Sequence, residues 1–427
     1  MDRTTQRRPA QRSGPSLGWA LRALSSGGRV LPSGARLLPA GETLLGRAPE
    51  PAGWAWPDDA LLSRAHARLV RAGSMLRLDD LDSRNGSCVN GRPVTSTHLE
   101  DGDLLRLGDT FLLARLQPVG ERLPPARGAL AGLVGEAPSM GRLRRELALV
   151  GPEADAVLLQ GETGTGKSLA AGVLHTLSGR SGALVRVNGA AVPAGLAEAA
   201  FFGHKRGAFT GAEADEPGYF RAAQGGTLFI DEVGHLPLGL QAKLLLAIEE
   251  RSVTPVGATR PVPVDLRLVA ATSRDLAQAV AEGDFLPELF ARLNAFPVRT
   301  PPLRERREDV LPLLQSALGP AHPPLSPDLV ERLLLHPWPY NVRELLQVGQ
   351  VLRLRGAGLA ELGVELVEDR LAPVEAGVGQ PEREQVRAAL QATGGQVKAA
   401  AERLGRSRRQ LYRDLQRLEL DPEDFRG

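Results

Sequence analysis

One stretch of the sequence combines residue types that could hold a phosphate group and a metal ion. Residues 161–168 read G-x-x-x-x-G-K-S and follow the apolar run 156–159. Glycines let backbone amides wrap around an anion, and a helix starting directly afterwards adds the field of its dipole. Lys167 would reach the outer phosphates of ATP, and the Ser168 hydroxyl would hold Mg²⁺. The predicted ATP-binding residues of the loop are Gly161, Glu162, Thr163, Gly164, Thr165, Gly166, Lys167 and Ser168.

Two carboxylates follow a second apolar run about sixty residues further along the chain. Residues 225–232 read GGTLFIDE, so Asp231 and Glu232 come at the end of a predicted strand. Asp231 would bind Mg²⁺, and Glu232 would polarise the attacking water. Such a pair taken alone is usually just the end of a strand, but after a phosphate loop it predicts a nucleotide-hydrolysing site.

The elements that must position these groups are those of a parallel sheet covered by helices. Strand-like runs at 156–160, 184–187, 227–230 and 266–271 alternate with helical stretches, a pattern typical of α/β domains. This makes a plain glycine-rich turn the weaker interpretation of residues 161–168. We expect the α/β core at 133–305, followed by a small helical lid at 306–371 whose apolar residues recur at helical spacing.

Composition places few limits on function. The chain has 427 residues, 42% of them hydrophobic and 24% charged, which suggests a soluble protein of two to four domains. The net charge of +2 gives no general affinity for nucleic acid. Cys88 alone cannot form an intramolecular disulfide or a cysteine-based zinc site, and no apolar run is long enough to span a bilayer. We expect a cytoplasmic protein.

Short strand-like segments separated by turns predict a β-sandwich at residues 29–117. Residues 1–28 are rich in Arg, Ser, Gly and Pro and are predicted to be disordered, and 118–132 to form a linker. The series GR at 46–47, SRAHA at 63–67, DSRNG at 82–86, VNG at 89–91 and LEDGD at 99–103 resembles the forkhead-associated (FHA) domain. The resemblance implies that Arg47, Ser63, Arg64 and Asn85 face a phosphothreonine, with His66 structural. A sandwich that keeps the fold without the ligand is the alternative.

Between the two nucleotide elements lies the hexapeptide GAFTGA, residues 207–212. Its flanking glycines predict a mobile loop with Phe209 and Thr210 at the tip, although a surface turn with a half-buried Phe is the simpler alternative. With LQAKL at 240–244, DLRLVAATSRDL at 265–276, PPLRER at 301–306 and WPYNVREL at 338–345, residues 133–370 resemble the AAA+ domain of bacterial enhancer-binding proteins. These proteins activate sigma-54 RNA polymerase. The resemblance implies sigma-54 contact by Gly207, Ala208, Phe209, Thr210, Gly211 and Ala212.

The same resemblance assigns further catalytic roles. Asn188 would restrain Glu232, and Arg292 would be an arginine finger given to a neighbouring subunit of a homo-oligomer, a hexamer when active. Thr272 and Ser273 would form the first nucleotide sensor and Arg343 the second. Three positions depart from the family pattern, namely Ser273 for Asn, Tyr340 for Gly and Leu286 for a second finger arginine. We therefore expect a slower or more conditional ATPase.

The C-terminal part, after a linker at 372–380, predicts a helix-turn-helix at 381–427. Seven basic residues against two acidic ones lie between Lys398 and Arg417, so a local basic face is available to DNA phosphates. It resembles the Fis-type helix-turn-helix, with a solvated basic helix as the alternative. The predicted DNA-contacting residues are Ser407, Arg408, Arg409, Gln410, Arg413 and Arg417.

Together these features predict a multidomain activator of sigma-54 RNA polymerase that binds enhancer DNA, ATP and Mg²⁺ and is controlled by a phosphothreonine-containing protein. Two alternatives remain. One is a DNA-bound repressor or scaffold with little hydrolysis. The other is an AAA+ remodeller recruited by a phosphopeptide to a client outside transcription.

Overall fold

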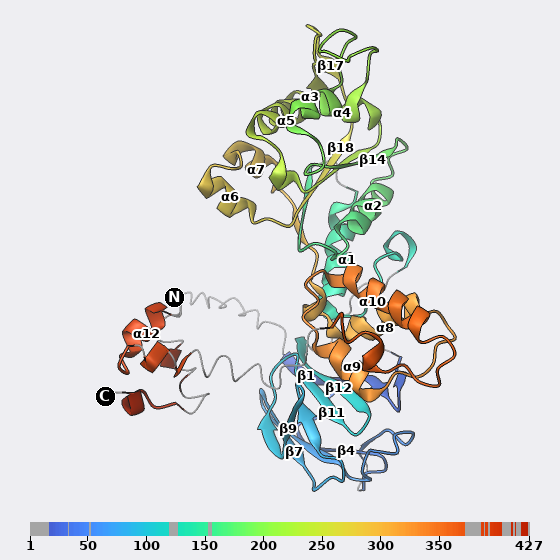
Figure 1. Ribbon diagram of the computed structural model, residues 1–427, viewed down its shortest axis with the longest axis vertical. Helices are drawn as coiled ribbons and strands as arrows, with labels where there is room; N and C mark the ends of the chain where they lie inside the picture. The colour runs from blue at the N-terminus through green and yellow to red at the C-terminus, as the bar shows by residue number, and fades with distance from the viewer. Residues whose placement is uncertain are drawn as a thin grey trace, which may run out of the picture.

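The computed structural model describes residues 17–32, 34–50, 53–118, 127–152 and 156–371, and beyond these only parts of 386–425. Figure 1 shows a β-sandwich in blue and cyan, an orange group of helices directly above it, and a green and yellow α/β body above those helices. The described residues contain no helix long and apolar enough to cross a membrane.

The sandwich consists of two antiparallel sheets with the strand orders β2-β1-β12-β11-β8-β9 and β10-β7-β6-β4-β5, and β3 pairs with β1 beside the first path. The parallel pairing of β4 with β5 is the exception. The strands are β1 (Leu17–Ser26), β2 (Arg29–Val30), β3 (Ala35–Leu37), β4 (Gly41–Gly46), β5 (Trp54–Ala55), β6 (Ala67–Ala72), β7 (Met75–Asp80), β8 (Ser87–Val89), β9 (Arg92–Val94), β10 (Ser96–His98), β11 (Leu104–Leu107) and β12 (Thr110–Pro118).

Strand β1 corrects the prediction that residues 1–28 are disordered. It runs from Leu17 to Ser26 and pairs antiparallel with β12 over most of its length. Trp19 and Leu21 are buried in the sandwich core, while Leu24 packs on its other side against the lid. Arg22, which interrupts the apolar run, is itself buried and pairs with Glu136 at 3.6 Å. The sandwich thus begins no later than residue 17. The sequence pattern did not reveal this strand, because a strand covered on both faces lacks the alternation of apolar and polar residues that marks a half-buried one.

The α/β body contains a five-stranded parallel sheet of order β14-β15-β18-β13-β19. These strands are β13 (Val157–Gln160), β14 (Leu184–Asn188), β15 (Thr227–Asp231), β18 (Arg267–Thr272) and β19 (Pro297–Arg299), and β16 (Ser252–Val253) pairs with β17 (Val262–Pro263) in a separate two-stranded sheet. The surrounding helices are α1 (Pro138–Val150), α2 (Lys167–Leu177), α3 (Ala194–Phe202), α4 (Gly218–Ala222), α5 (Leu238–Glu250), α6 (Leu276–Glu282) and α7 (Pro287–Leu293).

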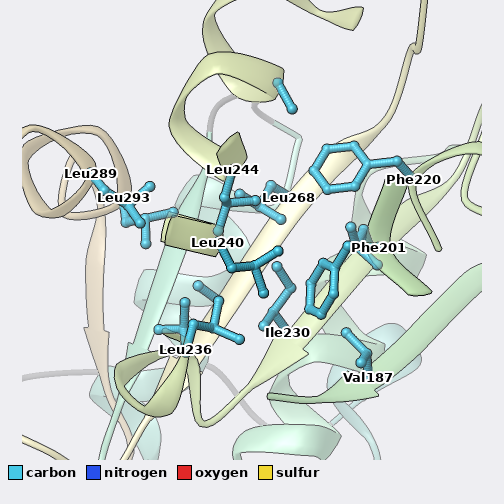
Figure 2. Close-up of a cluster of buried hydrophobic side chains, with 14 of the residues drawn as sticks. Val187, Phe201, Phe220, Ile230, Leu236, Leu240, Leu244, Leu268, Leu289 and Leu293 are labelled. Atoms are coloured by element: carbon cyan, nitrogen blue, oxygen red, sulfur yellow. The ribbon is translucent and has the colours of Figure 1, made fainter. Parts of the chain in front are cut away.

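Alternate residues of each strand face different helices. Leu158, Ile230 and Leu268 join a cluster that includes Phe201 and Leu240 from the helices (Figure 2). The intervening residues of the same strands, Val157 and Val269 among them, pack with α1 and α2. The sheet is therefore buried on both faces, as a parallel sheet requires, and the carboxyl ends of β13 and β15 are held at one edge.

The lid consists of α8 (Val310–Leu318), α9 (Pro327–Leu335) and α10 (Asn341–Arg355) with short 3-10 turns before and after them. Its apolar core continues into the sandwich, because Leu104, Phe111 and Leu113 belong to the same buried cluster as the lid leucines. In β12 the intervening Leu112 and Ala114 face the sandwich core instead. The seven-stranded sheet is thus covered by its partner sheet on one face and by the lid on the other.

The C-terminal part has α12 (Val397–Arg403) and a 3-10 turn at Pro422–Phe425. Val386, Leu390, Ala400, Leu411 and Leu415 are buried together, at the helical spacing read from the sequence. The six residues predicted to contact DNA lie outside the described residues, so their roles stay predictions. They are Ser407, Arg408, Arg409, Gln410, Arg413 and Arg417.

Candidate functional site

The loop at residues 161–166 joins β13 to α2, which is the arrangement that the sequence predicted. Gly164 has φ +81°, and a Cβ there would overlap the carbonyl oxygen of Tyr340 in the lid. Gly166 has φ +109° and is the N-cap of α2. Glycine is therefore required where the lid approaches the loop and where the backbone turns left-handed into the helix. The loop thus forms a cradle of backbone amides at the N-terminus of α2, which is the arrangement that phosphate binding requires.

Lys167 is buried, with its ammonium directed into this loop. Its Nζ donates hydrogen bonds to the carbonyl oxygens of Gly161 (2.8 Å) and Glu162 (3.2 Å) and lies 3.6 Å from Oε1 of Glu232. Ser168 follows it in the first turn of α2 with an exposed side chain. The two residues predicted to hold phosphate and Mg²⁺ are thus together at the edge where β15 ends.

Asp231 and Glu232 are at that edge, and they differ in environment. Burial raises the pKa of Asp231, which Lys167 and other neighbouring groups offset only in part. Glu232 has φ +52°, a left-handed conformation that is uncommon outside glycine and is found at functional sites. Its Oε2 accepts hydrogen bonds from Ser273 Oγ (2.8 Å) and Ser273 N (3.1 Å). Ser273 is therefore the residue that holds the predicted catalytic carboxylate.

Asn188 does not make the contact expected of it. It is next to Asp231 in the sheet register, but its side chain is exposed and its Oδ1 accepts a hydrogen bond from Ala190 N at 3.0 Å. In this conformation Asn188 therefore does not contact Glu232, because the asparagine is engaged by its own following turn, and its restraining role stays a prediction. Thr272, predicted to form the first nucleotide sensor together with Ser273, is buried and accepts a hydrogen bond from Arg274 N.

The lid contributes residues that the sequence reading did not place at the loop. Glu162 accepts hydrogen bonds from both Nη atoms of Arg304 and from Asn341 Nδ2. Asn341 also donates to Thr163 O, and Arg306 Nη2 donates to Thr165 O. The only signal in the sequence is their membership in the 301–306 and 338–345 motifs. The predicted second sensor, Arg343, is exposed, and its Cβ lies next to Gly164 of the phosphate loop.

The predicted finger, Arg292, lies away from this chain's own phosphate loop. It is exposed at the end of α7 and lines a small cavity of about 70 Å³ with Arg180, Arg251 and residues at the beginnings of β13 and β18. The loop follows the other end of β13. Leu286, where a second finger arginine was expected, packs partly buried against the sheet's hydrophobic cluster.

The turn at residues 207–212 differs from the loop that the sequence predicted. Gly207 N donates to Ala212 O at 2.8 Å, which closes the turn, and both glycines at 207 and 211 have positive φ. The Phe209 ring is half-buried against His204, with 4.9 Å between ring centroids, so Thr210 is the exposed tip residue. The simpler expectation, a surface turn with a half-buried Phe, fits this conformation. The turn lies with β17 in the loops at the top of Figure 1.

The four predicted phosphopeptide residues gather on loops at one end of the sandwich. Arg47 N donates to Ser63 O, Ser63 Oγ accepts from Arg84 N at 3.1 Å, and Asn85 Nδ2 donates to Leu61 O at 2.6 Å. Among the described residues, the exposed side chains of Arg47, Arg64 and Arg84 have no hydrogen-bond or ion-pair partner. Arg84 was not predicted, although it lies in the SRNG motif.

His66 is structural, as expected. It is fully buried, its Nδ1 accepts a hydrogen bond from Ser63 N at 3.1 Å, and its Nε2 bonds to Gly86 O at 3.0 Å. Burial lowers the pKa of its imidazole, so the neutral ring is favoured. His66 therefore connects the Ser63 loop to the Asn85 loop.

Comparison with known proteins agrees with these observations. Family models match residues 133–299 as the sigma-54 interaction domain, 43–108 as an FHA domain and 378–418 as a bacterial regulatory protein of the Fis family. The transcriptional regulatory protein ZraR of Salmonella typhimurium is 39% identical over 334 residues, which cover 74% of this chain and 76% of ZraR. This chain belongs to the sigma-54-dependent transcriptional regulators.

Two further relatives and one solved structure are also similar to this chain. GlrR of Escherichia coli K12 is 40% identical over 309 residues, which cover 69% of each protein. UacR of the same organism, described as a putative uric acid sigma-54-dependent transcriptional regulator, is 40% identical over 319 residues. This chain spans about half (54%) of the length of UacR. The crystal structure of NtrX from Brucella abortus in complex with ATP superposes with a TM-score of 0.50 at 31% identity, covering 67% of this chain and 69% of NtrX. The regulator therefore combines an FHA domain, an ATP-binding AAA+ ATPase domain and a Fis-type DNA-binding domain.

Proposed function

We propose that this chain is an ATP-driven activator of sigma-54 RNA polymerase. The observation that carries the proposal is that one α/β domain holds the phosphate loop, the carboxylates Asp231 and Glu232 beside it, and the GAFTGA turn. Lys167 and the loop amides would hold the phosphates, Ser168 and Asp231 would bind Mg²⁺, and Glu232 would act on water. When bound, ATP supplies the phosphoryl group whose hydrolysis provides free energy. The GAFTGA turn would transmit this free energy to sigma-54.

The test is open-complex formation at a sigma-54 promoter. Thr210→Ala should leave ATP hydrolysis within about twofold and abolish open-complex formation, because Thr210 is the exposed tip of the turn. Glu213→Ala, an exposed neighbour outside the turn, is the matched control. A Thr210→Ala chain that still opens promoters would rule out this role for the turn.

We also propose that hydrolysis requires a ring, a hexamer by resemblance to the family, in which each subunit gives Arg292 to its neighbour's nucleotide. Arg292 lines a cavity at the beginnings of β13 and β18, whereas the phosphate loop follows the other end of β13. Because a strand rises about 3.3 Å per residue, the length of β13 separates the two sites. The finger and the loop thus lie at opposite ends of the sheet's strands. A head-to-tail assembly joins such unlike surfaces and closes into a ring.

Mixed rings test the finger. Arg292→Ala and Lys167→Ala chains should each be inactive alone, whereas a mixture should recover ATPase, because an intact loop then meets an intact finger. A chain with both changes, mixed with wild type, is the control. Absence of recovery in rings that do assemble would place the finger in its own subunit's site.

For the sandwich we propose recognition of phosphothreonine by Arg47, Ser63, Arg64 and Asn85, with Arg84 as a further cation. Unpaired guanidinium groups beside a hydroxyl and an amide suit a phosphate dianion. Phosphorylated and unphosphorylated versions of a random threonine peptide library, applied to the full chain, test this. Equal retention of both would favour a sandwich without ligand.

The Fis-type domain supports enhancer DNA binding through the predicted residues 407–417. The Arg side chains suit phosphate and guanine contacts. Mapping the bound sites across a genome should find them upstream of sigma-54-type promoters.

A DNA-bound repressor or scaffold with little hydrolysis is the second candidate. The packing of Leu286 into the hydrophobic cluster favours it, because that position offers no second guanidinium. Hydrolysis by assembled rings at the rate of spontaneous ATP loss, with DNA binding intact, would support this candidate over the activator.

A further inference from the structure

Three arginines line one small cavity at the end of the sheet opposite the phosphate loop. Arg180 follows α2, Arg251 follows α5 and Arg292 belongs to α7, and all three border a space of about 70 Å³. We propose that Arg251 is a second cation that this chain gives, together with Arg292, to the phosphates of ATP bound by a neighbouring copy. The inference rests on the ring proposed above and adds a residue to its subunit contact that no sequence motif assigns.

The cavity carries an excess of positive charge. Arg180 Nη2 lies 2.9 Å from Asp265 Oδ1. The hydrogen bond from Arg180 lowers the pKa of Asp265, and the charge of Arg251 lowers it further. Among the described residues, neither Arg251 nor Arg292 has a hydrogen bond or an ion pair through its side chain. Three guanidinium groups around one carboxylate therefore leave room for a further anion.

The walls between the arginines are apolar. Phe220 and Leu268, which Figure 2 draws, line the cavity together with Ile248 and Val264. Beside an apolar wall, an anion is attracted by the arginines more strongly than it would be on an open surface. The cavity has room for more than one water-sized group, which suits the oxygens of a phosphoryl group but not a whole nucleotide. Charge and size thus favour a phosphate presented from outside.

The backbone at Arg251 is unusual for an arginine. Arg251 is the C-cap of α5 and has φ +51° and ψ +38°, a left-handed conformation in which glycine is less strained. Its carbonyl oxygen accepts a hydrogen bond from Val264 N at 2.8 Å, which holds the turn. The side chain is exposed. An exposed arginine in a strained position, held by its surroundings, is typical of a residue that acts on a ligand.

Helix α7 supplies one cation to this surface. It contains Arg292, whereas Leu286, just before its start, packs against the hydrophobic cluster of the sheet. In phosphoryl transfer, negative charge is spread over several phosphate oxygens, so a single guanidinium satisfies only part of it. Arg251 provides the second guanidinium from the end of α5, an element that is separate from α7.

Arg251→Gly tests the inference, because it removes the cation and keeps the left-handed turn. In assembled rings of the full chain, we expect kcat for ATP hydrolysis to fall about tenfold to hundredfold, the factor that corresponds to one hydrogen bond to a charged group. Arg251→Lys keeps the charge without the planar fork and should retain more of kcat. Arg353→Ala removes an exposed arginine of α10 and should change kcat less than twofold.

Two further measurements separate the loss of the cation from damage to the fold. The Tm of unassembled Arg251→Gly should be at least that of wild type, because glycine relieves the left-handed turn. Rings that mix Arg251→Gly with Lys167→Ala chains should recover ATPase, since the intact Arg251 of one chain then meets the intact loop of the other.

Wild-type kcat in Arg251→Gly rings would overturn the inference even if Arg292→Ala rings are inactive and the ring proposal stands. Absence of recovery in mixed rings that do assemble would also overturn it, because Arg251 would then act within its own subunit. An Arg292→Ala chain with full ATPase would instead contradict the ring proposal itself.

Discussion

In the phosphate loop, the key cation is buried and already paired, whereas on the sandwich the key cations are exposed and unpaired. Lys167 bonds to two loop carbonyls and lies beside Glu232. Arg47 and Arg64, by contrast, have no side-chain partner among the described residues, and their loops are fixed by backbone bonds to Ser63 and Arg64 carbonyls. The sandwich surface is thus ready for an anion, while the ATP site must exchange internal contacts for those of its ligand.

The two sites are joined by a buried interface between the sandwich and the lid. Arg115 of β12 forms a bidentate pair with Glu308, whose side chain has no exposed area, and Arg106 pairs with Asp328 and Glu331. Arg307 Nη1 donates to Gly102 O at 2.9 Å. The same short segment carries Arg304 and Arg306, which bond to the phosphate loop. A contiguous set of contacts therefore connects the sandwich to the ATP site.

The sharpest test of the contrast is Lys167→Ala. Removing a cation that must transfer from loop carbonyls to phosphates should weaken ATP binding about hundredfold or more, since charge-assisted bonds to phosphate are lost. A fluorescent ATP analogue measures the affinity. Phosphopeptide binding by the same variant should be unchanged. If ATP affinity is retained, the loop is held by other groups and the comparison fails.

Arg115→Ala tests whether the connecting interface stabilises the chain. It leaves Glu308 buried without its cation, and breaking a buried pair in this way costs about 3–5 kcal/mol. Calorimetry should show a large fall in the Tm of the sandwich and lid. Arg77→Ala, which removes an exposed partner of Asp79 on the same sandwich, should change stability by less than about 1 kcal/mol. Equal effects would mean that the interface is not closed in solution.

Asp309→Asn tests the contacts between Asp309, at the start of the lid, and the α/β core. Burial raises the pKa of Asp309 to about 6, with Glu308 adding to the rise, and its Oδ1 accepts from the amides of Glu136 and Ala137 at the start of α1. A raised carboxyl pKa means that the folded state binds the proton more tightly. Stability from this group is therefore complete below about pH 4 and is lost as the pH rises to about 6, by about 2–3 kcal/mol.

The asparagine keeps an acceptor for both amides and carries no charge. The variant should lose this pH dependence of unfolding and be at least as stable as wild type at pH 7. A wild-type stability that is flat between pH 4 and 6 would contradict the assignment.

Arg47→Ala should have the smallest effect. Loss of one exposed guanidinium from a set of three should weaken a phosphopeptide about tenfold, and added salt should reduce the difference because exposed charges are screened. Isothermal titration measures both. A complete loss of binding would mean that Arg47 is buried by the ligand, and the contrast with Lys167 would then disappear.

Much of the architecture followed from the sequence. The phosphate loop, the strand ending in Asp231 and Glu232, the sandwich motifs and the helical lid depend on local patterns of glycine, apolar residues and turns, and these patterns were enough to find the elements. The disordered prediction for Leu17–Ser26 was wrong, because a strand buried on both faces shows no alternation and contains the buried Arg22.

The sequence alone determined which residue types are available for chemistry, because a motif such as G-x-x-x-x-G-K-S requires only neighbouring residues. The tertiary structure decided which side chains meet. Glu232 lies on Ser273 rather than Asn188, Phe209 rests on His204, and Arg115 reaches Glu308 across 193 positions. These contacts depend on sheet register and domain packing, which join residues far apart in the chain and leave no periodic signal in it.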